Sequence, residues 1–247
     1  MPAGVEPDTL IPAVFIILVA SLLKSTTGFG FALIATPLLL LLWEPTLVVP
    51  IVLPLVLTVD VFIVAQNWRL LEPRRLAPML IAGVIGVPLG TYVLLVASPQ
   101  VLRLGIAGLV LVSAILLLLG VTVPISRERL AGGIAGFFSG LLVTSTSISG
   151  PPVALFMINQ RWAKHTFRTS LGLFFLGQVT LAIISLAGAG VLHSGTLLVS
   201  TILWIPVLLG YLAAIRLLPY VSEQGFLRIA MLIVMAAAVL AIANALW

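Results

Sequence analysis

The sequence predicts an all-α integral membrane protein made of two inverted repeats, each a broken-helix or re-entrant hairpin followed by three transmembrane helices. The first observation behind this prediction is composition: 62% of the 247 residues are hydrophobic and only 8% are charged, whereas soluble domains carry about 25% charged residues. The second is that short polar segments separate stretches of membrane-spanning length. The third is that motifs of the first half recur in the second.

Six apolar stretches have the length of one membrane-crossing helix, which needs roughly 20 residues. They are 45–66, 76–97, 101–121, 169–191, 196–217 and 226–246. Charged residues, proline or serine interrupt the chain between them, as in "NWRLLEPRR" and "LPYVSEQ". We therefore expect a transmembrane helix at each of the six.

Two other apolar stretches, 10–42 and 130–160, are too long for one straight span. Each is interrupted near its middle by hydroxyl- and glycine-rich sequence, "KSTTGFG" in the first and "TSTSISGPP" in the second. Unpaired backbone groups are costly in hydrocarbon, so a broken helix persists only against protein or a wet cavity. We predict a broken helix or hairpin in each stretch. The sequence is compatible with a re-entrant hairpin and with two short crossing helices.

The two halves of the chain match at an offset of 120 residues. The matching residues near the breaks are Leu22, Ser25, Thr26 and Gly30 with Leu142, Ser145, Thr146 and Gly150. In the same register "IGVPLG" (85–90) aligns with "IPVLLG" (205–210). Matches at both ends of each half predict a duplication, with a first repeat at 1–122 and a second at 123–247 in one membrane domain.

The distribution of charge predicts the topology. If each broken stretch enters and leaves the membrane on one face, ten of the twelve basic residues fall on one side. They are Arg69, Arg74, Arg75, Arg127, Arg129, Arg161, Lys164, Arg168, Arg216 and Arg228. Only Arg103 falls on the other side, and Lys24 lies in the membrane. Because cytoplasmic loops are enriched in Lys and Arg, we expect inverted halves, with both termini outside.

Composition also excludes several classes of function. The net charge of +5 is explained by topology signals, so no nucleic-acid partner is expected. The absence of cysteine excludes disulfides, thiolate metal sites and cysteine nucleophiles. No G-x-x-x-x-G-K-[ST] phosphate loop is present, so ATP is not the direct energy source. We expect no cofactor, no metal site and no enzyme activity.

The breaks predict an anion site. In inverted-repeat transporters, the N-termini of half-helices point at anionic substrate groups near the midplane. Here the second half-helices would begin after Gly30 and after Gly150, with Pro151 suited to a first-turn position. The predicted substrate-binding residues of the two breaks supply hydroxyls, backbone N–H groups or one cation. They are Lys24, Ser25, Thr26, Thr27, Gly28, Gly30, Thr144, Ser145, Thr146, Ser147, Ser149, Gly150 and Pro151. Such a donor set without carboxylates suits a small oxyanion.

Three polar residues inside apolar stretches have alternative interpretations. Lys24 contacts the substrate, snorkels to the interface or pairs with Asp60. Asp60, an acid inside a predicted span, carries a coupling proton or sits near a water-capped helix end. Gln178 binds the substrate, hydrogen-bonds between helices or merely packs; we include it among the candidate substrate-binding residues.

These motifs resemble a known family. "TGFGFALIATPLL" together with "SGLLVTSTSISGPPVALFM" is similar to the paired signature of the sulfite exporter TauE/SafE family of membrane transporters. The resemblance covers the whole chain and implies movement of sulfite, thiosulfate, or a sulfonate such as sulfoacetate, across the cytoplasmic membrane. Many relatives carry a Gly-Gly pair before the second proline, whereas this chain has Ser149 and Gly150 before Pro151 and Pro152. This departure concerns the choice of substrate within the class.

We therefore expect a secondary carrier for a small sulfur-containing anion, working by alternating access. An anion channel built from the same donors is one alternative, and an intramembrane hydrolase using Ser149 with a histidine is another. Coupling to protons, to sodium or to the membrane potential alone stays open. The expected partners are the anion, the lipid bilayer, a coupling ion and a second copy of the chain in a homodimer.

Overall fold

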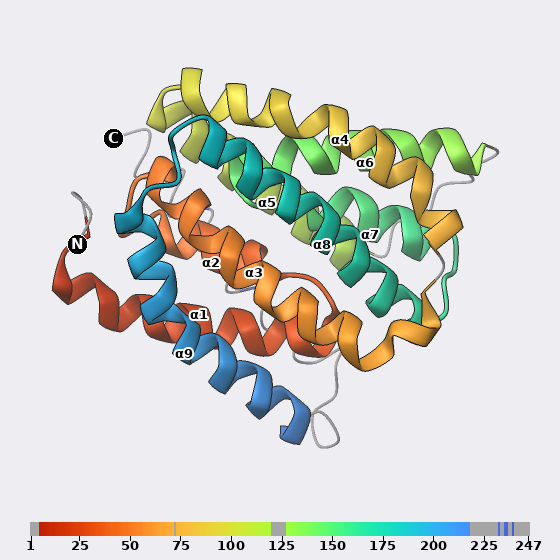
Figure 1. Cartoon of the computed structure of the whole chain (residues 1–247), viewed down its shortest axis with the longest axis horizontal. Coiled ribbons are helices and arrows are strands. Elements are labelled where there is room, and N and C mark those ends of the chain that lie inside the picture. Colours follow the sequence, from red (N-terminus) through yellow and green to blue (C-terminus); the bar gives the residue numbers. More distant parts are fainter. Residues whose placement is uncertain are drawn as a thin grey trace.

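The computed structural model describes residues 5–71, 73–119 and 127–217, together with the single positions 232, 235, 236 and 239. The described chain is helical and contains no strand (Figure 1). In chain order, its helices are α1 (Pro7–Thr27), α2 (Phe31–Leu39), α3 (Pro45–Asn67), the short 3-10 helix η1 (Trp68–Leu70), α4 (Pro73–Val96), α5 (Pro99–Leu119), α6 (Glu128–Thr146), α7 (Gly150–Asn159), α8 (Lys164–Gly188) and α9 (Ser194–Leu217). The all-α membrane class is confirmed.

Within the described residues, six helices are long and apolar enough to cross a membrane. Five of them, α3, α4, α5, α8 and α9, coincide with predicted spans. The sixth is α1, the first part of the stretch 10–42. The span predicted at 226–246 lies outside the described residues apart from single positions.

Both long stretches are broken where the sequence predicts. α1 ends at Thr27 and is capped by Gly28, and α2 starts after Gly30. Both glycines adopt the left-handed backbone conformation, with φ of 88° and 94°. This backbone conformation is accessible to glycine at no steric cost, so the helix can stop and restart within three residues. In the second stretch, Ser147 takes the left-handed position with φ of 58°.

The second break differs slightly from its prediction. α7 begins at Gly150 and not after it, so Pro151 occupies the first turn as expected. Corresponding boundaries, such as Thr27 and Thr146, are therefore 119 residues apart, one fewer than the sequence offset. The letter-by-letter match paired Gly30 with Gly150, whereas the structural counterpart of Gly30 is Ser149.

Each broken stretch returns to the end of the molecule where it began. Trp43, which follows α2, donates its indole N–H to the Thr9 hydroxyl at the start of α1, over 2.8 Å. In the second stretch, Arg75 contacts both ends: its Nε lies 2.9 Å from Glu128 Oε1 and its guanidinium lies 4.2 Å from the Trp162 ring centroid. The nine residues of α2 extend only about 13 Å. The two arms of this hairpin are therefore unequal, since α1 alone has the length of a span.

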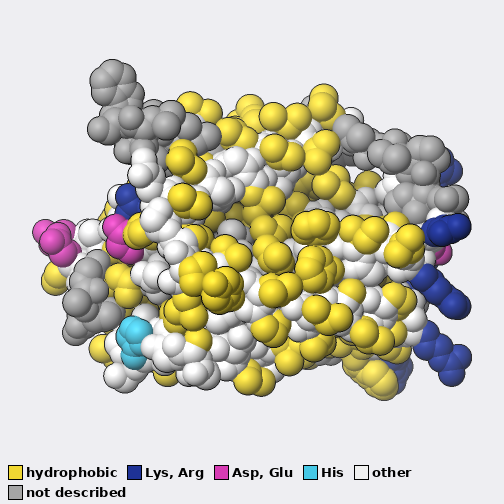
Figure 2. Space-filling view, turned by 90° about the horizontal axis from the view of Figure 1, so that it is seen from above, with side chains coloured by type: hydrophobic (Ala, Val, Ile, Leu, Met, Phe, Trp, Pro, Cys, Tyr) yellow, Lys and Arg dark blue, Asp and Glu magenta, His cyan; other side chains and the backbone are white. Residues whose placement is uncertain are grey.

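The charged side chains mark two opposite ends of the molecule (Figure 2). The described arginines gather at one end, separated by an apolar band from the end that carries most of the acids. Arg103 is the exception: it pairs with Glu44 over 2.9 Å at the acidic end. This distribution agrees with the charge pattern from which the topology was predicted. The positions of Arg228 and of the Lys164 side chain lie outside the described parts.

Two helix pairs pack across the halves of the chain. α1 lies against α9, and α6 lies against α4 (Figure 1). In the proposed duplication, these are the first helix of each half packed on the fourth helix of the other. The division into two inverted repeats remains our interpretation, and this reciprocal packing supports it.

Glycines allow α4 and α6 to approach closely. A Cβ atom added to Gly140 would collide with the backbone of Gly83, and one added to Gly136 would collide with the backbone of Met79. Small residues at helix contacts permit such close backbone approach, which stabilises membrane helices through van der Waals packing. The contact between α4 and α6 therefore depends on the absence of side chains at these positions.

Candidate functional site

A small cavity lies between the two breaks, and we call it the central cavity. Lining residues come from α1, α2, α3, α8 and the second break: Lys24, Gly30, Phe31, Ala32, Leu33, Val56, Ser147, Ile148, Ser149, Gly150 and Phe175. Both half-helix N-termini thus meet at one place, together with the only lysine of the described membrane segments. This is the arrangement expected from the sequence, although the lining set is different.

The start of α2 is the donor-rich wall of the central cavity. Ile34 is the first residue whose N–H bonds back along the helix, to the Gly30 carbonyl over 3.2 Å. The N–H groups of Phe31, Ala32 and Leu33 therefore lack intrahelical acceptors, as the first N–H groups of any α-helix do. All three residues line the cavity. They place partial positive charge where an anion could bind.

The start of α7 contributes fewer donors. Pro151 and Pro152 occupy its first turn, and proline has no N–H. The positive end of the α7 dipole still points at the cavity through Gly150. The Ser149 hydroxyl makes no hydrogen bond with any residue that the structure describes, whereas the Ser149 carbonyl accepts one from Ser139 over 2.7 Å. The two helix ends are therefore unequal as hydrogen-bond donors.

Lys24 forms a buried ion pair with Asp60. Its Nζ lies 2.8 Å from Asp60 Oδ1, and the two side chains are 2% and 0% exposed. The same Nζ lies 4.6 Å from the ring centroid of Phe175. The snorkelling interpretation of Lys24 is thus wrong, because the side chain turns inward to a partner. In the described part of the chain, no donor reaches the second oxygen of Asp60.

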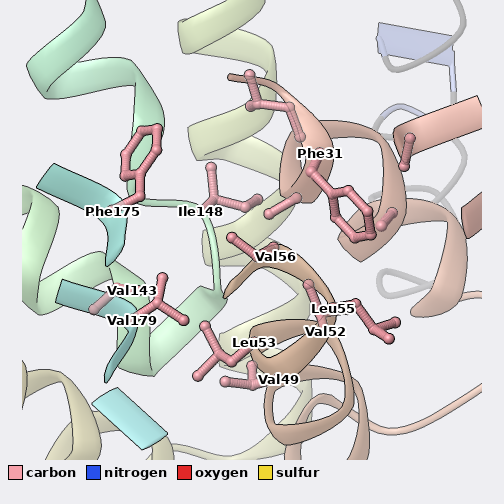
Figure 3. Packing of buried hydrophobic residues seen from close by; sticks show 14 of the residues in the cluster. Phe31, Val49, Val52, Leu53, Leu55, Val56, Val143, Ile148, Phe175 and Val179 are labelled. Carbon is pink, nitrogen blue, oxygen red and sulfur yellow. The ribbon is translucent and has the colours of Figure 1, made fainter. Parts of the chain in front are cut away.

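Apolar side chains close the central cavity around the cation. Figure 3 shows Ile148 between Phe175 and Phe31, with Val56 close by. All four residues line the cavity and are buried. The cavity has about 20 Å³ of space open to the centres of water molecules, which is room for about one water. The cavity in this structure is therefore too small to hold a polyatomic anion.

A hydrogen bond between hydroxyls joins the first hairpin to the second break. Thr36 on α2 and Ser147 lie 2.6 Å apart at their oxygens, and both are buried. Ser147 is also one of the two non-glycine residues with positive φ in the described chain. A left-handed conformation is unfavourable for serine, and this contact helps to offset the cost. Thr36 was not among the predicted site residues.

Most of the predicted hydroxyl donors point away from the central cavity. Thr26, Thr27, Ser145 and Thr146 donate to carbonyls of the preceding helical turn, and Thr144 donates to the Val87 carbonyl on α4. Ser25 is buried without a hydrogen-bond partner among the described residues. A hydroxyl in a helix readily bonds the carbonyl three or four residues back, so a hydroxyl-rich sequence overstates the donors available to a ligand.

Two further predicted residues, Gln178 and Gly28, lie outside the lining of the central cavity. Gln178 on α8 is buried and donates to the Leu80 carbonyl on α4 over 3.2 Å; it lies outside the cavity lining. Gly28 packs against Arg168 at the end of α1. Phe31, Val56 and Phe175 line the cavity without having been predicted. An apolar residue in an apolar sequence carries no signal of such a position.

The described acidic and histidine side chains lie apart from one another, and the His165 side chain lies outside the described parts. The described residues contain no group of three or more His, Asp or Glu side chains that could hold a metal ion. His193 lies in the loop before α9, where its Nδ1 is 3.1 Å from the Gly190 carbonyl, and it is not part of the cavity that holds Ser149.

Comparison with known proteins identifies one family. The family model described as "Sulfite exporter TauE/SafE" matches residues 13–242. No curated protein and no solved structure matches the chain significantly. The matched segment contains the breaks in both long stretches and every described helix except the first turns of α1.

Proposed function

The chain belongs to the sulfite exporter TauE/SafE family, and from this premise we propose that it is a secondary transporter for a small sulfur-containing anion of the sulfite, thiosulfate or sulfonate type. The observation that carries the proposal is the buried Lys24 in a cavity between two half-helix N-termini. A cation buried at membrane depth is costly and marks a functional site by default. In this proposal, Lys24, the N–H groups at the start of α2 and the Ser149 hydroxyl bind the anion.

Binding requires the central cavity to widen, because the closed cavity has room for about one water molecule. Two hairpins that meet at their breaks can separate in alternation toward the two ends of the molecule. The hydroxyl contact between Thr36 and Ser147 would hold them together in the closed form. This motion is the alternating access that we propose.

The ion pair suggests how anion binding is coupled to a proton. Lys24 lines the cavity. Asp60 is fully buried and is not among the lining residues. An anion that draws the Lys24 ammonium into the cavity leaves the Asp60 carboxylate without its partner. An uncompensated buried charge is strongly destabilising. Asp60 relieves it by taking up one proton, so with a singly charged anion the buried site stays neutral before and after binding.

We expect Ser149→Ala to weaken anion binding by roughly 10- to 150-fold, because a hydrogen bond from its hydroxyl to a charged group contributes roughly 1.5–3 kcal/mol. Ser145→Ala is the matched control: its hydroxyl donates to the Leu141 carbonyl, so its apparent affinity should change less than about twofold. Counterflow of labelled sulfite, thiosulfate, sulfate and sulfoacetate in proteoliposomes measures both variants. No saturable exchange of any of these anions by folded wild-type protein would overturn the sulfur-anion proposal. If the two variants weaken anion binding equally, the Ser149 hydroxyl does not bind the anion.

Anion binding should also take up about one proton per anion from solution. The measurement is the change of a pH indicator when a singly charged alkanesulfonate is added to the purified protein in weakly buffered detergent. Ser149→Ala should keep the ratio of protons to bound anions while binding more weakly. Anion binding without proton uptake would overturn the role of Asp60 and leave the anion site intact.

A further inference from the structure

A second and larger cavity opens at the arginine-rich end of the molecule, between the starts of α4 and α6 and the end of α7. We call it the basic cavity. Arg74, Arg75, Glu128 and Arg129 line its polar side, and Met79 and Phe156 are among the residues of its apolar side. It offers about 280 Å³ to the centres of water molecules. The central cavity lies at the opposite end of α7, at Gly150, so the two are separate sites.

The basic cavity carries an excess of positive charge. Three guanidinium groups face one carboxylate, and that carboxylate is already bound to Arg75 over 2.9 Å. Arg75 also stacks on Trp162, so its orientation is held from two sides. Arg74 and Arg129 are exposed and make no ion pair or hydrogen bond within the described ranges 5–71, 73–119 and 127–217. A planar guanidinium is suited to bidentate contact with a phosphate-type oxyanion.

The surface of α4 that continues from the basic cavity along the helix is apolar and exposed. Ile81 and Ile85 follow Arg74 on α4 at spacings that place them on the same helix face. They are 66% and 62% exposed. Figure 2 shows the same order of charged and apolar surface on the whole molecule: basic side chains, in dark blue, lie at the end of a broad hydrophobic band, in yellow. A ligand with an anionic head and hydrocarbon chains would satisfy both parts of this surface.

We propose that the basic cavity binds the phosphate group of an anionic phospholipid from the adjacent leaflet, with its acyl chains along α4. Basic pockets between membrane helices are suited to such headgroups. The bound lipid bridges the starts of α4 and α6, the two helices that pack closely through glycine. This site does not depend on which anion is transported.

The test compares retention of lipids by the purified protein in native mass spectrometry after exchange into mixed micelles. One arm contains phosphatidylglycerol, a second contains phosphatidylcholine, and a third contains phosphatidylglycerol with inorganic phosphate as competitor. Wild type should retain phosphatidylglycerol about tenfold better than phosphatidylcholine. The double variant Arg74→Gln/Arg129→Gln should lose this preference. Arg216→Gln removes one positive charge at the end of α9, outside the cavity lining, and should keep it.

Equal retention of the two lipids by wild type would overturn the proposal, as would an unchanged preference in the double variant. Displacement of phosphatidylglycerol by inorganic phosphate at equal concentration would assign the cavity to a free oxyanion and overturn the lipid. An unchanged thermal unfolding midpoint of the double variant in detergent shows that it is folded. Because retention is measured without transport, failure of this proposal and failure of the transport proposal are distinguishable.

Discussion

Lys24→Met is expected to destabilise the protein by about 3–5 kcal/mol and to abolish anion exchange. The substitution removes the cation and leaves Asp60 buried, with neither oxygen compensated by a described donor. Asp60→Asn should destabilise the protein to a similar extent, because it leaves the Lys24 ammonium buried without its counter-charge. In both single variants, stability is lost because the remaining charged side chain is buried without its partner.

The double variant Lys24→Met/Asp60→Asn should recover most of the lost stability. Replacing both members of a buried ion pair by uncharged residues is often neutral or stabilising, since no charge has to be desolvated. Exchange should remain absent, because the cation of the anion site is gone. Recovery of stability without recovery of transport would separate the structural contribution of the pair from its function.

The measurement is the unfolding midpoint of each variant in detergent, combined with counterflow of the sulfur anions. The exposed ion pair between Arg103 and Glu44, whose side chains are 35% and 52% exposed, provides the matched control. Arg103→Gln should cost no more than about 1 kcal/mol, as exposed pairs contribute little. A Lys24→Met protein as stable as wild type would contradict the buried pair, and one that still exchanges anions would contradict the role of Lys24.

Gly140→Ala is expected to have the second large effect and to destabilise the protein by about 1–3 kcal/mol or more. The new methyl group would collide with the backbone of Gly83 on α4. Backbone cannot rotate away as a flexible side chain can, so α4 and α6 would have to separate along their glycine contact. Loss of this packing removes a main source of stability between membrane helices.

Gly105→Ala on α5 is the control for this prediction. A Cβ atom at Gly105 meets nothing within 4 Å. Alanine also favours the helix over glycine by up to about 1 kcal/mol, so this variant should be as stable as wild type or slightly more stable. Thermal unfolding of both variants in the same detergent decides the comparison. If Gly140→Ala and Gly105→Ala unfold at the same temperature, close approach of α4 and α6 does not contribute to stability.

Features that depend on local sequence could be predicted without the structure. Helices α3, α4, α5, α8 and α9 follow from apolar runs of span length, because only helices satisfy the backbone of such runs in lipid. The breaks at Gly28 and Gly30 follow from the freedom of glycine, and the start of α7 follows from Pro151 to within one residue. Both breaks line one cavity, which is the position where the sequence predicts an anion site.

The tertiary structure decided which side chains share that cavity. Lys24 and Asp60 are far apart in sequence, and the interpretation that pairs them was only one of three. Their contact depends on how α1 packs on α3. For the same reason, sequence could not tell Ser149, whose hydroxyl is unpaired within the described chain, from Ser145, which bonds its own helix. A sequence determines where a helix can start, stop and cross a membrane, because these are properties of neighbouring residues. The rotation of each helix about its axis is set by packing against the others, and it decides which polar groups meet.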